Sequence, residues 1–237
     1  MEYKCNICKD EGFIFYKKRM RDNRVYEFSR PCECQIQMQN EKRIEQSNIS
    51  ELFKRCTFFN FAENTNEQKQ TKTKAVGFYR EVTSQNPADD KATGLLLYGQ
   101  VGSGKTHLAV ATLNNFMKYG KSGLYVNYKD LVRRLSQIAL DYNAYTSEID
   151  RCINIDVLLI DDLFKSRSLK DITQAQLNYM YEIINYRYMN KKTTIFTTEK
   201  SSEELLEIDS AIASRILQMT DKRYVLNMND IANYRLA

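Results

Sequence analysis

The sequence predicts an α/β protein: a three-layer domain with a mostly parallel sheet, preceded by a small cysteine-bearing module. Apolar runs of strand length alternate with longer amphipathic segments from Gly94 onwards, and this alternation is typical of strands joined by crossover helices. One apolar run leads directly into a glycine-rich loop, and four of the six cysteines lie within the first 34 residues. These observations define the two parts of the chain.

Length and composition are those of a globular protein with one sizeable core. The chain has 237 residues, of which 43% are hydrophobic and 27% are charged. No apolar run approaches the roughly 20 residues that a membrane-spanning helix needs, and the first residues lack the features of a signal peptide. We therefore expect a cytoplasmic protein with no membrane partner. The net charge of +5 permits binding to nucleic acid without requiring it.

Four apolar runs are expected to form the sheet: "GLLLY", "SGLYVNY", "IDVLLIDDLF" and "KTTIFTTEK". Segments with apolar residues at helical spacing separate them. These are the residues after the glycine-rich loop, "KDLVRRLSQIALDY", "QAQLNYMYEIINYRYMN" and a last helix around "SAIASRILQM". The polar stretch after the cysteines lacks glycine and proline, which predicts a connecting helix. The expected division is a module at 1–34, a helical linker at 35–54 and the main domain at 55–237.

The glycine-rich loop "GQVGSGKT" matches the phosphate-binding pattern G-x-x-x-x-G-K-[ST], with an apolar strand before it and a helix after it. Its glycines let successive backbone N–H groups point at phosphate oxygens, and the helix dipole adds to the attraction. Lys105 is expected to reach the β and γ phosphates and Thr106 to ligate Mg²⁺. His107 is included as a neighbour of the nucleotide, although a helix residue packed or exposed beside the loop is the simpler interpretation. The nucleotide contacts predicted here are Gly99, Gly102, Ser103, Gly104, Lys105, Thr106 and His107.

Two carboxylates follow the third apolar run, where a buried strand would reach its carboxyl end. Asp161 is expected to hold Mg²⁺, and Asp162 to orient or deprotonate the attacking water. The fourth strand ends in Thr197, Thr198 and Glu199. A polar residue there, for which we take Thr198, would contact the γ-phosphate or its water; a plain strand-end turn is the alternative.

Basic residues after the second strand are candidates for DNA contact. Lys129, Arg133 and Arg134 lie in one segment with Tyr142 and Tyr145. Cations can follow phosphates, and tyrosines can stack on bases. A solvated helix face is an equally good interpretation of the same pattern.

Cys5-x-x-Cys8 and Cys32-x-Cys34 form two closely spaced pairs separated by residues 9–31. Such pairs around a stretch that can fold as two strands are typical of a tetrahedral site with four cysteine ligands, which predicts structural zinc. A module this short also buries too little surface to be stable without a cross-link. Four reduced cysteines in a small core are the alternative. A redox Cys-x-x-Cys is disfavoured because no thioredoxin-like βαβ pattern surrounds it.

The main domain resembles the AAA+ ATPases of the DnaC/DnaI-type helicase loader family and their IstB-type transposition relatives. The resemblance spans residues 55–237 and rests on "TFFNF", "GLLLYGQVGSGKTHLA", "LLIDDL", "IFTTE", "AIASRI" and "NYR". It implies the additional-strand ATPase fold with sheet order 5-1-4-3-2. A cysteine-rich module ahead of such a domain is similar to DnaI-like loaders.

The resemblance also implies roles for particular residues. It places "TFFNF", and with it Phe59, beside the adenine, and it makes Arg235 a sensor of the nucleotide. It makes Arg215 a finger that enters the ATP site of a neighbouring subunit, so that the chain self-associates through this site. From the residues alone, Arg215 can equally be an arginine on a helix surface. Glu199 stands where many members of the family have Asn.

Three functions are consistent with these features. The first is a replicative helicase loader, a Mg²⁺-dependent ATPase with slow, assembly-stimulated turnover that binds a ring helicase and single-stranded DNA. The second is a transposase-helper ATPase that assembles on duplex DNA. The third is a nucleotide-gated adaptor with negligible turnover. The four-cysteine module favours the loader, because such a module is unusual in transposition helpers.

Overall fold

The computed structural model describes residues 3–46, 50–84, 92–166, 168, 171–231 and 233. Within these residues the main domain contains a five-stranded parallel sheet in the order β4–β5–β6–β3–β7. If these five strands are renumbered 1 to 5 in chain order, starting at β3, the order read from β7 to β4 is 5-1-4-3-2. The sheet order implied by the resemblance is therefore confirmed. The strands are β3 (Gly94–Tyr98), β4 (Gly123–Asn127), β5 (Val157–Asp161), β6 (Thr193–Thr198) and β7 (Val225–Asn227).

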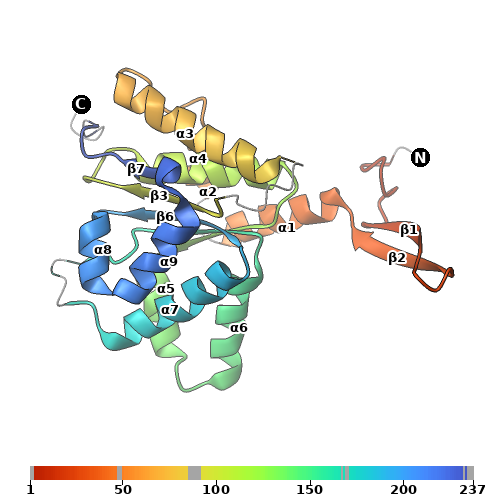
Figure 1. Ribbon diagram of the computed structural model, residues 1–237. Helices are drawn as coiled ribbons and strands as arrows, with labels where there is room; N and C mark the ends of the chain where they lie inside the picture. The colour runs from red at the N-terminus through yellow and green to blue at the C-terminus, as the bar shows by residue number, and fades with distance from the viewer. Residues whose placement is uncertain are drawn as a thin grey trace.

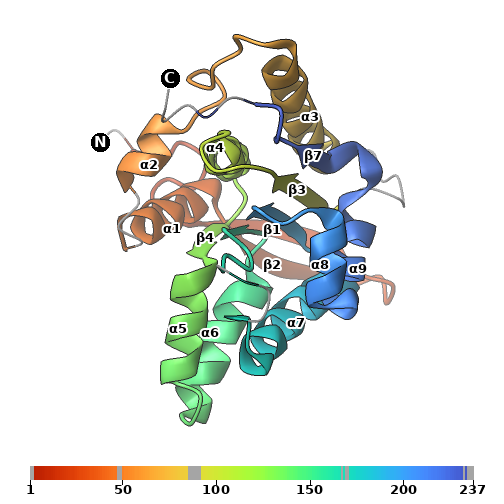
Figure 2. The ribbon, with the colours of Figure 1, turned by 90° about the vertical axis from the view of Figure 1, so that its left-hand side faces the viewer.

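Helices cover both faces of this sheet, which gives the three layers that were predicted (Figures 1 and 2). Side chains of successive strand residues point to opposite faces. Accordingly, Leu95 and Leu97 belong to one buried cluster and Leu96 belongs to the other. The first layer contains α1 (Glu33–Gln46), α2 (Ser50–Arg55), α3 (Asn66–Thr83) and α4 (Lys105–Lys118). The second contains α5 (Tyr128–Gln137), α6 (Tyr142–Asn154), α7 (Gln174–Met189), α8 (Ser202–Ile208) and α9 (Ser210–Thr220).

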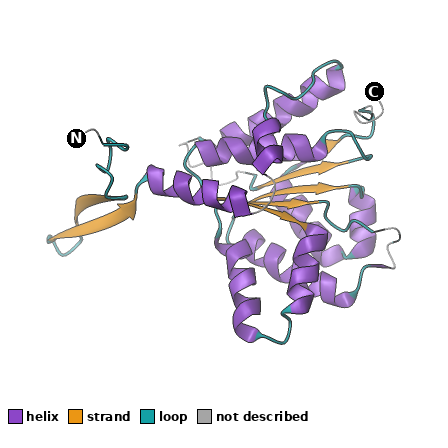
Figure 3. Ribbon diagram, turned by 180° about the vertical axis from the view of Figure 1, so that it is seen from behind, coloured by secondary structure: helices purple, strands orange, loops and turns teal. Residues whose placement is uncertain are grey.

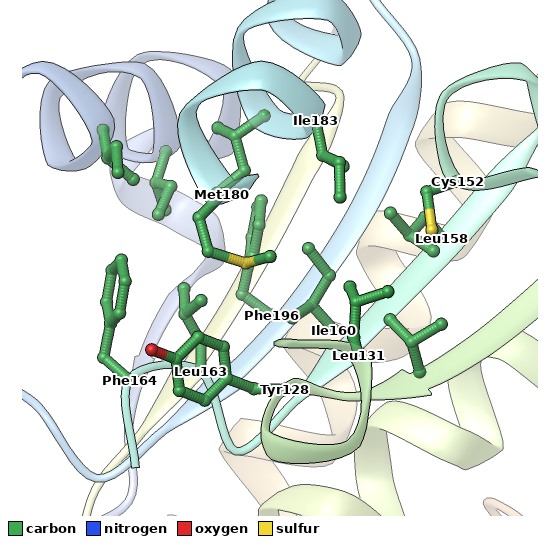
Figure 4. Close-up of a cluster of buried hydrophobic side chains, with 14 of the residues drawn as sticks. Tyr128, Leu131, Cys152, Leu158, Ile160, Leu163, Phe164, Met180, Ile183 and Phe196 are labelled. Carbon is green, nitrogen blue, oxygen red and sulfur yellow. The ribbon is translucent and has the colours of Figure 1, made fainter. Parts of the chain in front are cut away.

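The larger cluster fills the space between the sheet and the second layer (Figure 4). Ile160 and Phe196 project from neighbouring strands and meet Met180 and Ile183 of α7, and all four side chains are fully buried. Burying each side chain of this size is worth about 1.5–3 kcal/mol. The apolar runs of the sequence therefore form strands that are buried on both faces, as parallel strands are.

Two helical segments differ from what the apolar spacing predicts. Helix α3 lies in a polar stretch and begins with a capping box: Thr65 accepts from the backbone N–H of Gln68, whose side chain accepts from that of Thr65. The helix predicted over "KDLVRRLSQIALDY" ends at Gln137. Asp141 then caps a separate helix, α6, by accepting from the N–H of Ala144. Local capping chemistry defines both of these helix starts.

The N-terminal module is an antiparallel hairpin of β1 (Phe13–Arg19) and β2 (Val25–Pro31). It projects from the rest of the molecule at the far end of α1 (Figures 1 and 3). Helix α1 is held to the main domain by the buried side chain of Asn40, which donates to the carbonyl of Lys121 (2.8 Å) and accepts from the N–H of Gly123 (3.1 Å). None of the helices in the described ranges is both long and apolar enough to cross a membrane.

A fully buried arginine, Arg187 of α7, joins three elements where β5 and β6 begin. Its guanidinium donates to the carbonyls of Cys152 and Ile155 (2.9 Å each), to that of Thr193 (2.5 Å) and to the hydroxyl of Thr194 (2.8 Å). Burial lowers the pKa of Arg187 to about 10, which leaves it charged at neutral pH. The carbonyls at the end of α6 thus have a charged donor in the core.

We predict that Arg187→Met lowers the free energy of unfolding by about 3 kcal/mol or more, because several buried carbonyls lose their donor. Arg151→Met is the matched control. Arg151 pairs with Glu148 at the surface and is 43% exposed, so its loss should cost under about 1 kcal/mol. Urea unfolding monitored by circular dichroism measures both. Equal midpoints for the two variants would contradict the assigned role of Arg187.

Candidate nucleotide and metal sites

The phosphate loop lies between the end of β3 and the start of α4. Gly104, with φ +93°, immediately precedes the helix, and Gly102 has φ +80°, a conformation that residues with a Cβ rarely adopt. A Cβ on Gly102 would lie 1.8 Å from Oδ1 of Asn233, so this part of the loop is also covered closely by the C-terminal segment. The amide of Gln100 donates to the carbonyls of Asn229 and Ile231 in the same segment (2.9 and 2.8 Å).

Lys105 is buried at the start of α4. Its ammonium group donates to the carbonyls of Gly99 and Gln100, both at 2.7 Å. Burial lowers the pKa of Lys105. The loop thus holds the ammonium group through its own carbonyls, and phosphate oxygens would replace them as acceptors.

Asp161, at the end of β5, accepts three hydroxyl hydrogen bonds. Thr106 and Thr197 donate to Oδ1 (2.9 and 2.5 Å), and Tyr125 of β4 donates to Oδ2 (2.8 Å). Burial raises the pKa of Asp161, while the hydroxyl groups of Thr197, Tyr125 and Thr106 act to lower it. Adjacent ligands of octahedral Mg²⁺ at about 2.0–2.1 Å lie about 2.9 Å apart. The Thr106 and Asp161 oxygens have this spacing, so this pair fits a Mg²⁺ ion.

Asp162, the next residue, is engaged by a lysine that the sequence analysis did not consider. The Lys165 ammonium group lies 2.8 Å from Oδ2 of Asp162 and 3.3 Å from Oε1 of Glu199. All three residues line the same pocket as Lys105. This ion pair engages Oδ2, one of the two carboxylate oxygens of Asp162 that could accept a proton from water.

This pocket has a volume of about 600 Å³ and extends from the phosphate loop to the aromatic segment "TFFNF". Phe61 lines it and packs edge-on against the ring of His107, with centroids 5.5 Å apart. The Nε2 of His107 lies 2.9 Å from the carbonyl oxygen of Thr57, so this histidine links α4 to the aromatic segment. Phe59 is 93% exposed and is not among the lining residues. Phe61 is therefore the phenylalanine of this segment that faces the expected nucleotide position.

Two other predicted nucleotide contacts, Thr198 and Arg215, are not among the residues that line the pocket. Thr198 is buried, and its hydroxyl donates to the carbonyl of Leu163 (2.8 Å) rather than facing the pocket. Arg215 of α9 does not line the pocket. It bonds to Asn185 and Tyr181 of α7 (2.7 and 3.1 Å) and stacks on the Tyr181 ring. Arg235 lies outside the described residues.

The candidate DNA contacts lie on α5, at the end of the second layer. Arg133 pairs with Asp130 (2.8 Å), and Arg134 pairs with Glu148 (2.9 Å). Both side chains remain about half exposed or more. Carboxylates of the same chain thus offset two of the three positive charges, those of Arg133 and Arg134. The third charge is that of Lys129.

The four N-terminal cysteines meet at the base of the hairpin. All four sulfur atoms lie within 4.8 Å of one another, with 3.7 Å between Cys5 and Cys32 and 3.4 Å between Cys8 and Cys34. Tetrahedral zinc with Zn–S bonds of about 2.3 Å places its ligands about 3.8 Å apart. The backbone N–H groups of Cys8 and Ile7 lower the pKa of Cys5 to about 7, whereas the thiol of Cys8 and burial raise that of Cys34 to about 12. The arrangement fits a structural zinc ion held by four thiolates, since a cation would offset their repulsion.

Comparison with known proteins agrees with this geometry. Residues 39–236 match the family of IstB-like ATP binding proteins. The chain belongs to this family. It is 30% identical over 231 residues to the phage-like element PBSX protein XkdC of Bacillus subtilis (strain 168), covering 94% of this chain and 82% of that protein. It is 24% identical over 203 residues to the replicative helicase loader DnaC of Escherichia coli (strain K12), covering 84% and 73%.

Solved structures extend the comparison. A crystal structure of the DnaC helicase loader aligns with a TM-score of 0.55 and 31% identity over 74% of this chain and 95% of that one. The DnaI crystal structure (TM-score 0.56, 22% identity, 77% and 90% coverage) shares the fold. AMPPCP-bound DnaA from Aquifex aeolicus also shares it (TM-score 0.54, 22% identity), over 68% of this chain and about half, 47%, of that one. This IstB-like protein therefore has the α/β fold of AAA+ ATPases and is a homologue of DnaC and DnaI.

Two residues of this IstB-like site were missed from the sequence. Tyr125 stands between Leu124 and Val126 in β4 and has the strand's one phenolic hydroxyl group. This polar group in a buried strand was a usable signal. Lys165 follows the two aspartates by three residues, but nothing in its spacing indicates that it turns back towards them. Asp162 and Phe164 both have positive φ (57° and 55°) and produce that turn.

We predict one zinc ion per chain. The double variant Cys32→Ser, Cys34→Ser should lose it, because two of the four thiolates are removed. Cys56→Ser, in the core of the main domain, should keep it. Metal analysis of purified protein measures both, and stoichiometric zinc in the double variant would exclude this ligand set.

We also predict that Asp162→Asn binds ATP but loses most of its turnover, whereas Lys165→Ala raises basal turnover several-fold, since it frees the Asp162 carboxylate. Lys105→Ala should lose nucleotide binding because phosphate charge loses its main partner. Nucleotide titration and phosphate release separate these effects. If turnover falls in Lys165→Ala, the lysine assists the reaction, and the inhibitory role of its ion pair is wrong.

Proposed function

We propose that this protein is an ATP-dependent helicase loader in DNA replication, which binds a ring helicase and single-stranded DNA under the control of ATP binding and hydrolysis. The observation that carries the proposal is the continuity of α1. This helix (Glu33–Gln46) contains Cys34, a member of the cysteine cluster, and Asn40, which is hydrogen-bonded at the start of β4. Strand β4 also carries Tyr125, which bonds to Asp161 in the nucleotide site. The exposed module and the ATP site are therefore joined by regular structure, and the homology to DnaC and DnaI supports the same function.

In the proposed reaction, water attacks the γ-phosphorus and the bond to the bridging β–γ oxygen breaks, giving ADP and inorganic phosphate. Lys105 and the loop N–H groups hold the phosphates, and Thr106 and Asp161 would hold Mg²⁺, which neutralises charge on the phosphate oxygens when bound. Asp162 accepts the proton of water, and Lys165 competes for this carboxylate through Oδ2. We therefore expect slow turnover while the ion pair is in place.

The proposal includes self-association through the ATP site. Arg215 lies outside the pocket of its own chain, and Tyr181 and Asn185 fix its side chain in one orientation. A cation held in this way is suited to the nucleotide of a neighbouring subunit, where it would stabilise charge in the transition state.

We predict that Arg215→Ala protein binds ATP normally but hydrolyses it at least tenfold more slowly. Mixing it with Lys105→Ala protein should restore part of the activity, because some mixed interfaces join an intact phosphate loop to an intact arginine. Phosphate release across mixing ratios measures the recovery. An absence of recovery, with mixed assembly verified by cross-linking, would exclude action between subunits.

The hairpin supplies the surface for the helicase in this proposal. Residues that face each other across its strands share one side of the ribbon. The Phe15 face contains Phe13, Phe15, Lys17, Arg19, Val25 and Glu27. Phe15 is 60% exposed and Val25 is 54% exposed. Exposed aromatic and aliphatic side chains of this kind mark surfaces for protein partners.

Co-sedimentation of the full-length protein with the ring helicase of its host tests the proposed function. Wild type should capture the helicase, Phe15→Ser should lose most of the capture, and Lys105→Ala should retain it because the hairpin does not need nucleotide. Capture that is unchanged by Phe15→Ser would show that another surface binds the helicase. No capture by wild type would overturn the loader assignment.

The IstB-like family match favours a transposase-helper ATPase as the second candidate. That protein would assemble on duplex DNA with ATP and recruit a transposase instead of a ring helicase. A nucleotide-gated adaptor is the remaining alternative, and single-turnover hydrolysis near zero with and without DNA would identify it.

A further inference from the structure

The two faces of the hairpin differ in chemistry. Strand register places Ile14, Tyr16 and Lys18 directly opposite Arg30, Phe28 and Tyr26. These six residues form the second side of the ribbon, here called the Tyr16 face. Three of the six are aromatic and two are basic. No carboxylate occupies a strand position on this face, whereas Glu27 lies opposite Lys17 on the Phe15 face.

Two rings of the Tyr16 face stack on each other, and the rings of Tyr16 and Tyr26 are open to solvent. Tyr16 and Phe28 stack with centroids 5.8 Å apart and planes 23° from parallel. Tyr16 is 44% exposed and Tyr26 is 43% exposed. The hydroxyl of Tyr26 donates to Asp22 in the turn (2.9 Å), which fixes this ring at the end of the ribbon. The face therefore presents a platform of ring surfaces with a basic residue at each end.

Positive charge is concentrated in this hairpin. Residues 12–31 contain six basic residues and two carboxylates, a net charge of +4, against +5 for the whole chain. In the part of the chain that the structure describes, none of these six forms an ion pair, whereas Arg133 and Arg134 of α5 both do. The hairpin thus has more cations available for an external anion than α5 has.

We propose that the Tyr16 face of the hairpin is a binding site for single-stranded DNA, separate from the ATPase domain. Unpaired bases stack on the exposed rings, and the phosphates between them follow Lys18 and Arg30. Stacking on aromatic rings needs bases with free faces, which a single strand offers and a duplex does not. This site rests on the proposed function and deepens it: that function includes single-stranded DNA but uses only the Phe15 face of the hairpin, for the helicase.

Fluorescence anisotropy of a labelled oligothymidylate tests the proposal, with full-length zinc-loaded protein and without ATP, so that nucleotide-dependent contacts do not contribute. Tyr16→Ala should weaken binding roughly tenfold, because one base loses its stacking partner. Lys18→Ala should reduce the slope of log affinity against log salt by about 0.7, as one phosphate contact is lost. The neighbours on the opposite face, Phe15→Ala and Lys17→Ala, are the matched controls and should bind as wild type. Zinc content and circular dichroism verify that each hairpin is folded.

Equal losses from Tyr16→Ala and Phe15→Ala would overturn the assignment to one face. If the protein binds the duplex of oligothymidylate and oligoadenylate as tightly as it binds the single strand, the choice of ligand is wrong. The same variants in the helicase assay separate this proposal from the proposed function. Tyr16→Ala should still capture the helicase; normal DNA binding with lost capture would assign the Tyr16 face to a protein partner instead.

Discussion

The buried carboxylate of Asp161 is the point on which the site depends. It accepts hydrogen bonds from hydroxyl groups on three other elements: Thr106 at the start of α4, Tyr125 on β4 and Thr197 on β6. A carboxylate in a buried position is costly unless donors surround it, and these three hydroxyl groups offset that cost for Asp161. The parallel sheet makes this possible, because the carboxyl ends of neighbouring strands meet at one edge.

The same edge positions the groups that would control turnover. Asp162 leaves β5 in a left-handed conformation, and Lys165 returns to bridge it to Glu199 at the end of β6. The carboxylate suited to activate water is thereby paired beside a fully formed phosphate loop. If Asp162 activates water as we propose, this pairing favours nucleotide binding over turnover.

Much of this arrangement could be predicted from the sequence, because it follows from local patterns. The phosphate loop, the paired aspartates and the four cysteines each occupy a short stretch with fixed spacing, and the family resemblance supplied the strand order. Helix α3 was missed because its start depends on a capping box in a polar segment and not on apolar spacing. Arg187 and Lys165 could not be assigned, because the partners of Arg187 lie on other elements and Lys165 reaches Asp162 through an unusual backbone turn. Tyr125 was overlooked although its place in the strand was a usable signal. Within the aromatic segment Phe59 was chosen as the nucleotide contact, two residues before Phe61, because sequence does not tell which of three phenylalanines points inward.

Cys34 belongs both to the cysteine cluster and to the first turn of α1, and only six positions separate it from Asn40, where the helix is anchored. An α-helix advances about 1.5 Å and rotates about 100° per residue. Inserting or deleting a single residue between these two positions would therefore swing the ribbon about a quarter of a circle around the helix axis while displacing it very little. The number of residues in this short segment therefore sets the direction in which both hairpin faces point, and a change of one residue would redirect them with no change to the surfaces themselves.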